Sequence, residues 1–271
     1  MDDDFDLPKG ELMRGKRGVV MGVANKNSIA WGIAAQIAAQ GGEVALAYME
    51  SNEKRVRPLG EKIGVSLYTT FDASSDDSME SSFKVVEDAW GGIDFLVHAI
   101  AFAGPDQIKG SFVENATRAG FAQALDISCY SFVDASRRAA RLMKSGGSIV
   151  TLTYLGSERA IPNYNTMGVA KAALEAATRY IARDLGPAGI RVNAISAGAM
   201  RTLSLAGISG GRGMLAQGRK LSALKEDTSM EGVAGAALWL ASDLGRSTTG
   251  EVVHVDAGFH IMGFKEDEAE G

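Results

Sequence analysis

The chain has 271 residues, of which 46% are hydrophobic and 23% are charged, proportions that are ordinary for a globular protein. Its 33 acidic residues outnumber its 28 basic ones, so the formal net charge is −5. A negative balance disfavours nucleic acid or an anionic membrane as the main partner. Much of the acidic charge lies in residues 1–14 and 264–271, which we expect to be solvated tails of a single domain.

Cysteine content and the length of the apolar runs indicate the compartment. The single cysteine, Cys129, excludes an internal disulfide and fits a reducing environment. The N-terminus is acidic and lacks the apolar core of a signal peptide. No stretch approaches the ~20 uninterrupted apolar residues that a membrane-spanning helix needs. We therefore expect a cytoplasmic protein with no membrane partner.

Short apolar runs alternate with longer helical patterns along the chain. This alternation predicts βαβ units, and hence an α/β fold with a parallel sheet covered by helices on both faces. The chain has no linker, repeat or low-complexity block, which favours a single doubly wound Rossmann domain of about seven strands. The expected strands are residues 17–24, 43–48, 65–71, 93–101, 146–154, 189–198 and 250–258. One long helix is expected from about 117 to 143.

The junction between the first strand and the first helix carries a weak nucleotide-binding signal. Gly22 ends the strand, Ser28 lies six residues on, and Gly32 follows inside the helix. Glycine lets the backbone turn tightly and approach a pyrophosphate, whose charge is favoured at a helix N-terminus. The full G-x-G-x-x-G fingerprint is absent, because Ala24 and Asn25 stand where the later glycines would come. A purely structural turn explains the pattern equally well.

The ends of the second and third strands bear on the choice of cofactor. An NADP-selective site commonly has an Arg or Lys just after the second strand, where it meets the ribose 2′-phosphate. Here the nearest basic residues, Lys54 and Arg55, lie several positions into the next helix, which favours NADH over NADPH. Asp72, after the third strand, is placed either to meet the adenine edge or to cap the next helix.

Two tyrosines and a lysine lie at and beyond the end of the fifth strand. Tyr164 precedes Lys171 by seven residues, about two helical turns, so we expect both side chains on one side of an Ala-rich helix. A phenol is a poor acid at neutral pH, because its unperturbed pKa is near ~10. A neighbouring ammonium would lower that pKa, which predicts a proton-delivery site formed by Tyr154, Tyr164 and Lys171. The alternative is that the tyrosines are core residues whose hydroxyl groups reach solvent.

Six motifs in this order resemble the short-chain dehydrogenase/reductase superfamily, and more closely its NADH-dependent enoyl-acyl-carrier-protein reductases. The resemblance extends from Gly15 to about Phe259. The motifs are GVANKNSIAWGIA, VHAIAFA, DISCYSFV, TYLGSERAIPNYNTMGVAKAALEA, RVNAISAGAMRTL and GEVVHVDAGF.

Two departures separate this chain from the classical members of the superfamily. Classical members place the lysine four residues after the tyrosine, whereas the residue four after Tyr164 is Gly168. They also end the fourth strand in an Asn-Asn-Ala-Gly type of sequence, where this chain has residues His98 to Ala101. Both departures are typical of the enoyl reductase branch.

The resemblance implies which residues hold NADH. Contacts near the pyrophosphate and its ribose would come from Gly22, Ser28 and Ile29. Met49 would lie near the adenosine, where some members have glutamine. Asp72 and Ala73 would bind the adenine, and Ile100 would lie beside a ribose of the cofactor. The carboxamide and the phosphates would be surrounded by Met200, Arg201, Thr202, Leu203 and Ser204. No metal ion is implied.

The resemblance also implies a reaction, the reduction of the carbon–carbon double bond of trans-2-enoyl thioesters on acyl carrier protein. This is the last step of the type II fatty acid elongation cycle. Charge would build on the thioester oxygen, where a hydrogen bond from Tyr164 would stabilise it. Lys171 would bind the nicotinamide ribose hydroxyls, Ala103 would touch the substrate, and Tyr154 would be a second active-site tyrosine.

A glycine-rich stretch between residues 199 and 227 predicts a lid over the substrate. Five basic residues and no acidic one lie between Ala199 and Lys225. Apolar lining with mobile hinges suits an acyl chain, and the surplus of positive charge suits an acidic carrier protein. The alternative is an ordinary amphipathic helix with a solvated basic face.

Two alternative functions are compatible with a Rossmann domain. A ketoreductase or related alcohol dehydrogenase would keep the fold, but the spacing from Tyr164 to Lys171 opposes it. A non-catalytic NAD(H)-binding regulator is opposed by the presence of both residues. The resemblance further implies a homotetramer, with an interface formed by the apolar helices after strands four and five.

Overall fold

The computed structural model describes residues 7–202 and 211–263 of the chain. Seven strands form one parallel sheet in the order β3-β2-β1-β4-β5-β6-β7. The order runs outward from β1 in both directions, which is the doubly wound arrangement that was predicted. The strands are β1 (Arg17–Met21), β2 (Glu43–Tyr48), β3 (Leu67–Thr70), β4 (Phe95–His98), β5 (Gly147–Thr153), β6 (Ile190–Ala197) and β7 (Val252–Val255).

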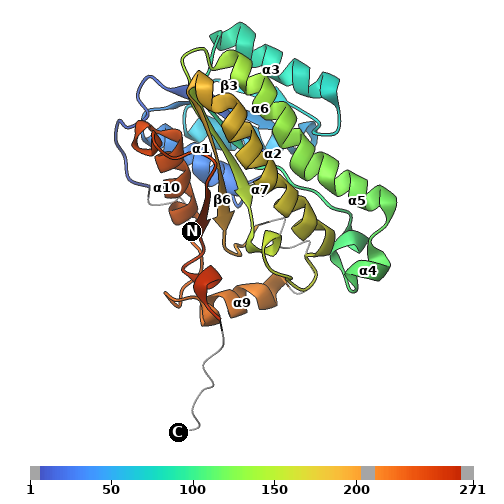
Figure 1. Cartoon of the computed structure of the whole chain (residues 1–271). Coiled ribbons are helices and arrows are strands. Elements are labelled where there is room, and N and C mark those ends of the chain that lie inside the picture. Colours follow the sequence, from blue (N-terminus) through green and yellow to red (C-terminus); the bar gives the residue numbers. More distant parts are fainter. Residues whose placement is uncertain (1–6, 203–210, 264–271) are drawn as a thin grey trace.

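Helices cover both faces of the sheet (Figure 1). One face packs against α1 (Ile29–Ala39), α2 (Glu53–Lys62) and α10 (Met230–Ala241). The other packs against α3 (Asp76–Trp90), α6 (Ser131–Leu142) and α7 (Asn165–Leu185). Neighbouring residues of one strand divide between the two cores: Val19 joins the second and Val20 the first. Burial on both sides explains why these strands read as continuous apolar runs.

The expected long helix from 117 to 143 is interrupted. It comprises α5 (Arg118–Leu125), a π-helical turn (Asp126–Tyr130) and α6. In the π turn, the hydroxyl of Ser128 is buried and both accepts from the backbone N–H of Phe102 (2.9 Å) and donates to its carbonyl (3.0 Å). The wider turn therefore coincides with the point where this helix binds the chain that leaves β4.

Two further α-helices and several short 3-10 segments complete the described chain. The helices are α4 (Phe112–Asn115), beside α5, and α9 (Gly211–Leu221), which lies beyond the carboxyl end of β6, below it in Figure 1. Among residues 7–202 and 211–263, no helix is both long enough and apolar enough to cross a membrane.

Candidate active site

A cavity opens at the carboxyl ends of the central strands. Its volume is about 1010 Å³, which includes the part that is open to solvent. The strand register pairs Met21 with His98 and His98 with Thr151, so β1 and β4 end at the same level and β5 continues two residues further. In doubly wound sheets this crevice, at the switch point between β1 and β4, is where ligands bind.

The structure gathers most of the predicted site residues around this cavity. Those that line it are Gly22, Ser28, Ile29, Ile100, Tyr154, Tyr164, Lys171, Met200 and Thr202. Those that lie beyond its lining are Met49, Asp72, Ala73, Ala103 and Arg201. Leu203 and Ser204 fall outside the described residues.

Gly22 allows the backbones after β1 and β4 to approach each other. Its φ is +96°, a conformation that other residues rarely adopt. A Cβ atom here would lie 2.2 Å from the carbonyl oxygen of Ala99, so a side chain would collide with backbone. The floor of the cavity therefore requires glycine at this position, although the G-x-G-x-x-G fingerprint is incomplete.

The N-terminus of α1 faces the same cavity. Ser28 precedes the helix, yet its side chain makes no capping bond to the helical N–H groups. Its hydroxyl instead donates to the carbonyl of Asn25 (2.6 Å) and accepts from the N–H of Ala24 (3.3 Å), which closes the loop. The N–H groups of Trp31 and Gly32 donate to the carbonyl of Ser28, and those of Ile29 and Ala30, at the start of α1, suit an anion such as a pyrophosphate.

Tyr154 and Tyr164 meet edge to face over the cavity. Their ring centroids are 4.9 Å apart, with an interplanar angle of 70°. Tyr154 follows the last residue of β5, and Tyr164 directly precedes α7. Tyr154 also borders a smaller cavity of about 440 Å³ toward α9, and residues 197–199 line both spaces with it.

The acidity of both phenols differs from the expectation. Burial raises the pKa of Tyr164, and Tyr154 and Glu175 raise it further. Burial also raises the pKa of Tyr154, with a smaller contribution from the carboxylate of Asp256. The prediction that Lys171 lowers the phenol pKa is therefore wrong, because burial dominates the shift and Lys171 is not among the groups that contribute to it. A protonated phenol at neutral pH is a hydrogen-bond donor.

Lys171 is buried and tied to the end of β5. Its Nζ atom donates to the carbonyl of Leu152 at 2.6 Å. Burial lowers the pKa of Lys171 to about 8, opposed by the carboxylate of Glu175 and by Cys129. Glu175, one helical turn further along α7, accepts a hydrogen bond from Thr153 Oγ1 at 2.6 Å. Consecutive residues of β5 thus hold an ammonium and a carboxylate of α7.

Backbone packing explains why the lysine is not four residues after Tyr164. A Cβ atom on Gly168 would lie 2.6 Å from the carbonyl oxygen of Gly156, so no side chain fits there. A Cβ on Gly156 would in turn lie 2.3 Å from the Tyr164 ring. The residue four positions before Lys171 is Met167, which is buried and has no proton to give. The phenol that lines the cavity together with Lys171 therefore comes from Tyr164, which directly precedes α7.

Two of the three residues expected near the adenosine, Met49 and Asp72, are exposed, and Ala73 is partly buried. Met49, just after β2, keeps 54% of its surface accessible. Asp72 accepts hydrogen bonds from the N–H and the hydroxyl of Ser74 (2.9 and 2.7 Å), and these bonds lower its pKa. Ser75, rather than Asp72, caps α3 by accepting from the N–H of Ser78. The capping explanation for Asp72 is therefore wrong.

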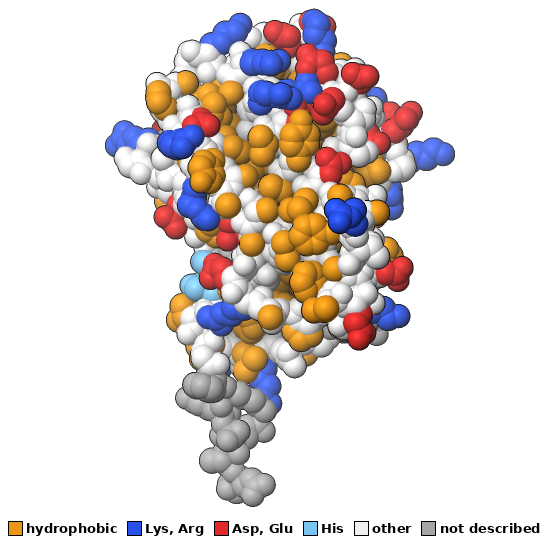
Figure 2. Space-filling model, turned by 45° about the vertical axis from the view of Figure 1, so that its right-hand side comes forward, with side chains coloured by type: hydrophobic (Ala, Val, Ile, Leu, Met, Phe, Trp, Pro, Cys, Tyr) orange, Lys and Arg blue, Asp and Glu red, His pale blue; other side chains and the backbone are white. Residues whose placement is uncertain are grey.

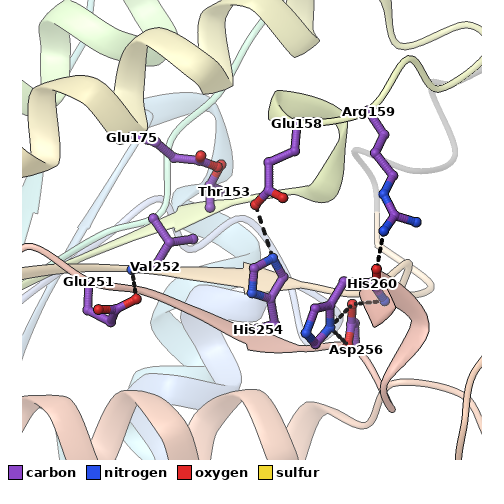
Figure 3. A network of polar contacts seen from close by, with 9 residues as sticks. All are labelled: Thr153, Glu158, Arg159, Glu175, Glu251, Val252, His254, Asp256 and His260. Atoms are coloured by element: carbon purple, nitrogen blue, oxygen red, sulfur yellow. Dashed lines mark hydrogen bonds and ion pairs between the residues drawn. The ribbon is translucent and has the colours of Figure 1, made fainter. Parts of the chain in front are cut away.

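A polar network supports the turn that follows β5 (Figure 3). His254 of β7 lies 3.2 Å from Glu158 of that turn, and its ring stacks on His260 with centroids 4.0 Å apart. His260 is held by Asp256 at 2.9 Å, and its carbonyl accepts from Arg159. Glu158 and Arg159 thus bind the turn to β7 and to the segment that follows it.

His98 fixes the end of β4 behind the cavity. Its ring is fully buried, 2.9 Å from Ser131 Oγ and 3.2 Å from Thr151 Oγ1. Burial lowers its pKa to about 3, and the nearby Lys171 acts in the same direction. The imidazole is therefore neutral at physiological pH, and its role is to join β4, β5 and α6.

Within the described part of the basic stretch, residues 211–221 form α9 and residues 199–202 and 222–227 are not helical. Lys220 is on α9, and Arg219, on the same helix, pairs with Asp227. Leu215 of α9 lines the smaller cavity beside Tyr154. Leu203, Leu205 and Ile208, which belonged to the predicted lid, lie outside the described residues.

Comparisons with known proteins agree on one activity. A family model described as enoyl-(acyl carrier protein) reductase matches residues 22–260. An NADH enoyl-acyl-carrier-protein reductase of Rhizobium meliloti (strain 1021) is 49% identical over 259 residues, 95% of this chain and 96% of its own. The crystal structure of the Anaplasma phagocytophilum enoyl reductase with NAD has a TM-score of 0.92 at 48% identity, covering 98% of this chain and 100% of that one. The Bacillus cereus enzyme, solved with NADP+ and indole naphthyridinone, has a TM-score of 0.91 at 45% identity, covering 94% and 100%.

Proposed function

The chain belongs to the enoyl-acyl-carrier-protein reductase family, and from that premise we propose that it reduces trans-2-enoyl thioesters on acyl carrier protein with NADH. The observation that carries the proposal is the placement of Tyr164 and Lys171 on one cavity at the β1–β4 switch point. When bound, NADH supplies the hydride. The reaction is the last step of the type II fatty acid elongation cycle.

The residues around the cavity fit a dinucleotide. Gly22 leaves room for close approach of a pyrophosphate, and α1 offers N–H groups without a side-chain cap. Lys171 presents a buried ammonium with donors to spare for ribose hydroxyls, because one of its three protons is used by Leu152. We assign these three elements to the pyrophosphate and nicotinamide half of NADH.

NADH is favoured over NADPH by the chain that follows β2. The exposed Met49 and Glu50 come first, and neither can pair with a 2′-phosphate. Arg55 instead donates to Asn52 Oδ1 at 2.5 Å, and Arg57 donates to Glu53 Oε1 at 2.6 Å. Two arginines at the start of α2, Arg55 and Arg57, are thus engaged by neighbouring residues of the chain.

Tyr164 is proposed to donate its hydrogen bond to the thioester oxygen. Because burial keeps the phenol protonated, it can stabilise the negative charge that develops there as the β-carbon accepts hydride. Tyr154, packed against its ring, restricts the direction in which the phenol points. Lys171 is proposed to orient the cofactor and not to ionise Tyr164.

The ketoreductase alternative is opposed by the same geometry. Chemistry on a ketone would need a proton donor at the classical position, four residues before Lys171, and Met167 stands there. Product analysis separates the two reactions. With NADH deuterated at C4, we expect one deuterium at the β-carbon of the saturated acyl product. If the protein instead transfers deuterium to the carbinol carbon of a product made from a 3-ketoacyl thioester, and transfers none to an enoyl thioester, the proposal is contradicted.

Carrier docking beside α9 is a further part of the proposal. Lys220 and Lys225 are exposed and lie close in sequence to Arg219, which lines the smaller cavity, and their positive charge suits an acidic carrier protein. Charge reversal of Lys220 and Lys225 tests this docking. We expect these changes to raise KM for the carrier-linked substrate and to leave KM for the coenzyme A thioester unchanged.

We also propose a homotetramer that uses the outer faces of α5, α6 and α7. Large apolar side chains are exposed there, including Tyr130, Val133, Val169 and Tyr180. Figure 2 shows hydrophobic side chains gathered in a band down one face of the molecule. Exposed patches of this kind mark protein–protein interfaces. Sedimentation velocity tests the assembly, and a monomer at micromolar concentration would contradict it.

A further inference from the structure

The two asparagines that flank Tyr164 have an unusual backbone. Asn163 and Asn165 have φ of +61° and +41°, whereas Tyr164 between them has φ of −104°. Asparagine enters the left-handed region more readily than most residues, but two such residues around one tyrosine need support from their surroundings. Such conformations at a candidate site motivate a search for that support.

Both asparagines bind one residue, Gly110. The N–H of Gly110 donates to Asn163 Oδ1 at 3.1 Å, and Asn165 Nδ2 donates to the carbonyl of Gly110 at 3.1 Å. The partners fix the orientation of each amide, because an N–H pairs with an oxygen and a carbonyl pairs with an NH₂ group. One residue therefore holds the backbone on both sides of Tyr164.

Gly110 belongs to a segment that is itself anchored. The buried Gln107 donates to the carbonyl of Asn115 (2.9 Å) and accepts from Thr166 of α7 (3.4 Å). Asn115 donates to the carbonyl of Lys109 at 2.6 Å. The segment between β4 and α5 is thus fixed internally and bound to α7 one residue after Asn165.

We propose that Asn163 and Asn165 are positioning residues, which clamp Gly110 and thereby aim the Tyr164 phenol at the substrate oxygen. Neither side chain lines the cavity, so they act through Tyr164. The same segment supplies Ile108 and Ala103, which pack against the cluster that contains Tyr164. The clamp therefore links the wall on the substrate side to the hydrogen-bond donor. This inference rests on the proposed role of Tyr164.

Aspartate substitutions distinguish the clamp from a general effect of charge or shape. Asn163→Asp keeps the acceptor that meets the Gly110 N–H, whereas Asn165→Asp removes the donor that meets the Gly110 carbonyl. Both changes keep the side-chain shape and add one negative charge. We expect kcat with crotonyl-CoA to be at least fivefold lower in N165D than in N163D, with the Kd for NADH within twofold of wild type in both. Equal losses, or a parallel loss of NADH affinity, would overturn the proposal.

A double variant tests whether the clamp works through Tyr164. If it does, N165D should lower kcat by less than twofold in a Tyr164→Phe background, because the aimed hydroxyl is already gone. Losses that multiply would overturn the positioning role. The role of Tyr164 in the proposed function is tested separately by the single variant. If Y164F is as active as wild type, Tyr164 does not stabilise the substrate oxygen, irrespective of the kcat of N165D. Retained NADH binding shows that each variant is folded.

Discussion

The Nζ atom of Lys171 lies 2.6 Å from the backbone carbonyl oxygen of Leu152. This bond joins the middle of α7 to the end of β5, and Lys171 lines the cavity. Tyr164 is not among the groups that shift the pKa of Lys171, and Lys171 is not among those that shift the pKa of Tyr164. This independence agrees with the separate roles proposed for them, Lys171 toward the cofactor and Tyr164 toward the substrate.

The first prediction concerns pH. The pKa of Lys171 is lowered to about 8, so the side chain is an ammonium below that pH and a neutral amine above it. If the ammonium binds the ribose, NADH affinity should be constant at pH 6–7 and should fall as pH rises through about 8. Titration calorimetry from pH 6.5 to 9.5 measures this.

Lys171→Ala is the control for that titration. Removal of one charged hydrogen bond should weaken NADH binding on the order of tenfold and abolish the dependence on pH. An unchanged Kd in this variant, or a wild-type Kd that stays flat to pH 9.5, would contradict the assignment of Lys171.

The second prediction concerns Glu175, whose carboxylate raises the pKa of Lys171 against the effect of burial. Glu175→Gln removes that charge, while the amide oxygen can still accept from Thr153. The pKa of Lys171 should fall further, so the loss of NADH affinity should begin at a lower pH than in wild type. Asp184→Asn, at the exposed end of α7, is the matched control. If both variants keep the wild-type pH profile, the carboxylate does not act on Lys171.

The third prediction concerns Tyr164. Tyr164→Phe removes one preorganised donor, and we expect kcat to fall by roughly tenfold or more with NADH affinity unchanged. Steady-state kinetics and calorimetry separate the two quantities. Tyr68→Phe, on the distant strand β3, controls for the loss of a tyrosine hydroxyl. Equal turnover in both variants would exclude Tyr164 from stabilising the oxygen.

The fourth prediction uses two glycines with similar backbones. Gly22 and Gly15 have φ of +96° and +75°, so alanine at either position costs about 1 to 2 kcal/mol of backbone energy. Only Gly22 has a close neighbour, the carbonyl of Ala99, whereas nothing lies within 4 Å of a Cβ on Gly15. Thermal unfolding should therefore show the larger loss for G22A, and NADH binding should fall in that variant alone. Equal losses would mean that close approach at Gly22 is unimportant.

Much of the fold could be predicted because the strands are buried on both faces. Continuous apolar runs alternate with helical periods, which leaves few arrangements other than a parallel doubly wound sheet. The spacing of Tyr164 and Lys171 was also sufficient to place both on one cavity. The interruption of the expected 117–143 helix was not predictable, because it depends on the bond between Ser128 and Phe102 of another segment.

The electrostatics of the site were predicted less well. The direction of the Tyr164 pKa shift depends on burial by segments far apart in sequence, which the Tyr–Lys spacing does not reveal. Glu175 was missed, although it lies four residues after Lys171 and a strand-end threonine faces it. The structural role of His98 was not predicted, because its hydrogen-bond partners Ser131 and Thr151 lie on α6 and β5.

The most direct test of the reaction is the absorbance of NADH when the purified protein meets crotonyl-CoA or an enoyl-carrier thioester, with NADPH and a 3-ketoacyl thioester run in parallel. The account predicts oxidation of NADH that depends on the enoyl thioester, little with NADPH and none with the ketoacyl substrate. Oxidation only with NADPH would overturn the assignment around Met49 and Glu50. No oxidation by either cofactor with an enoyl thioester, in protein that binds NADH, would contradict the account.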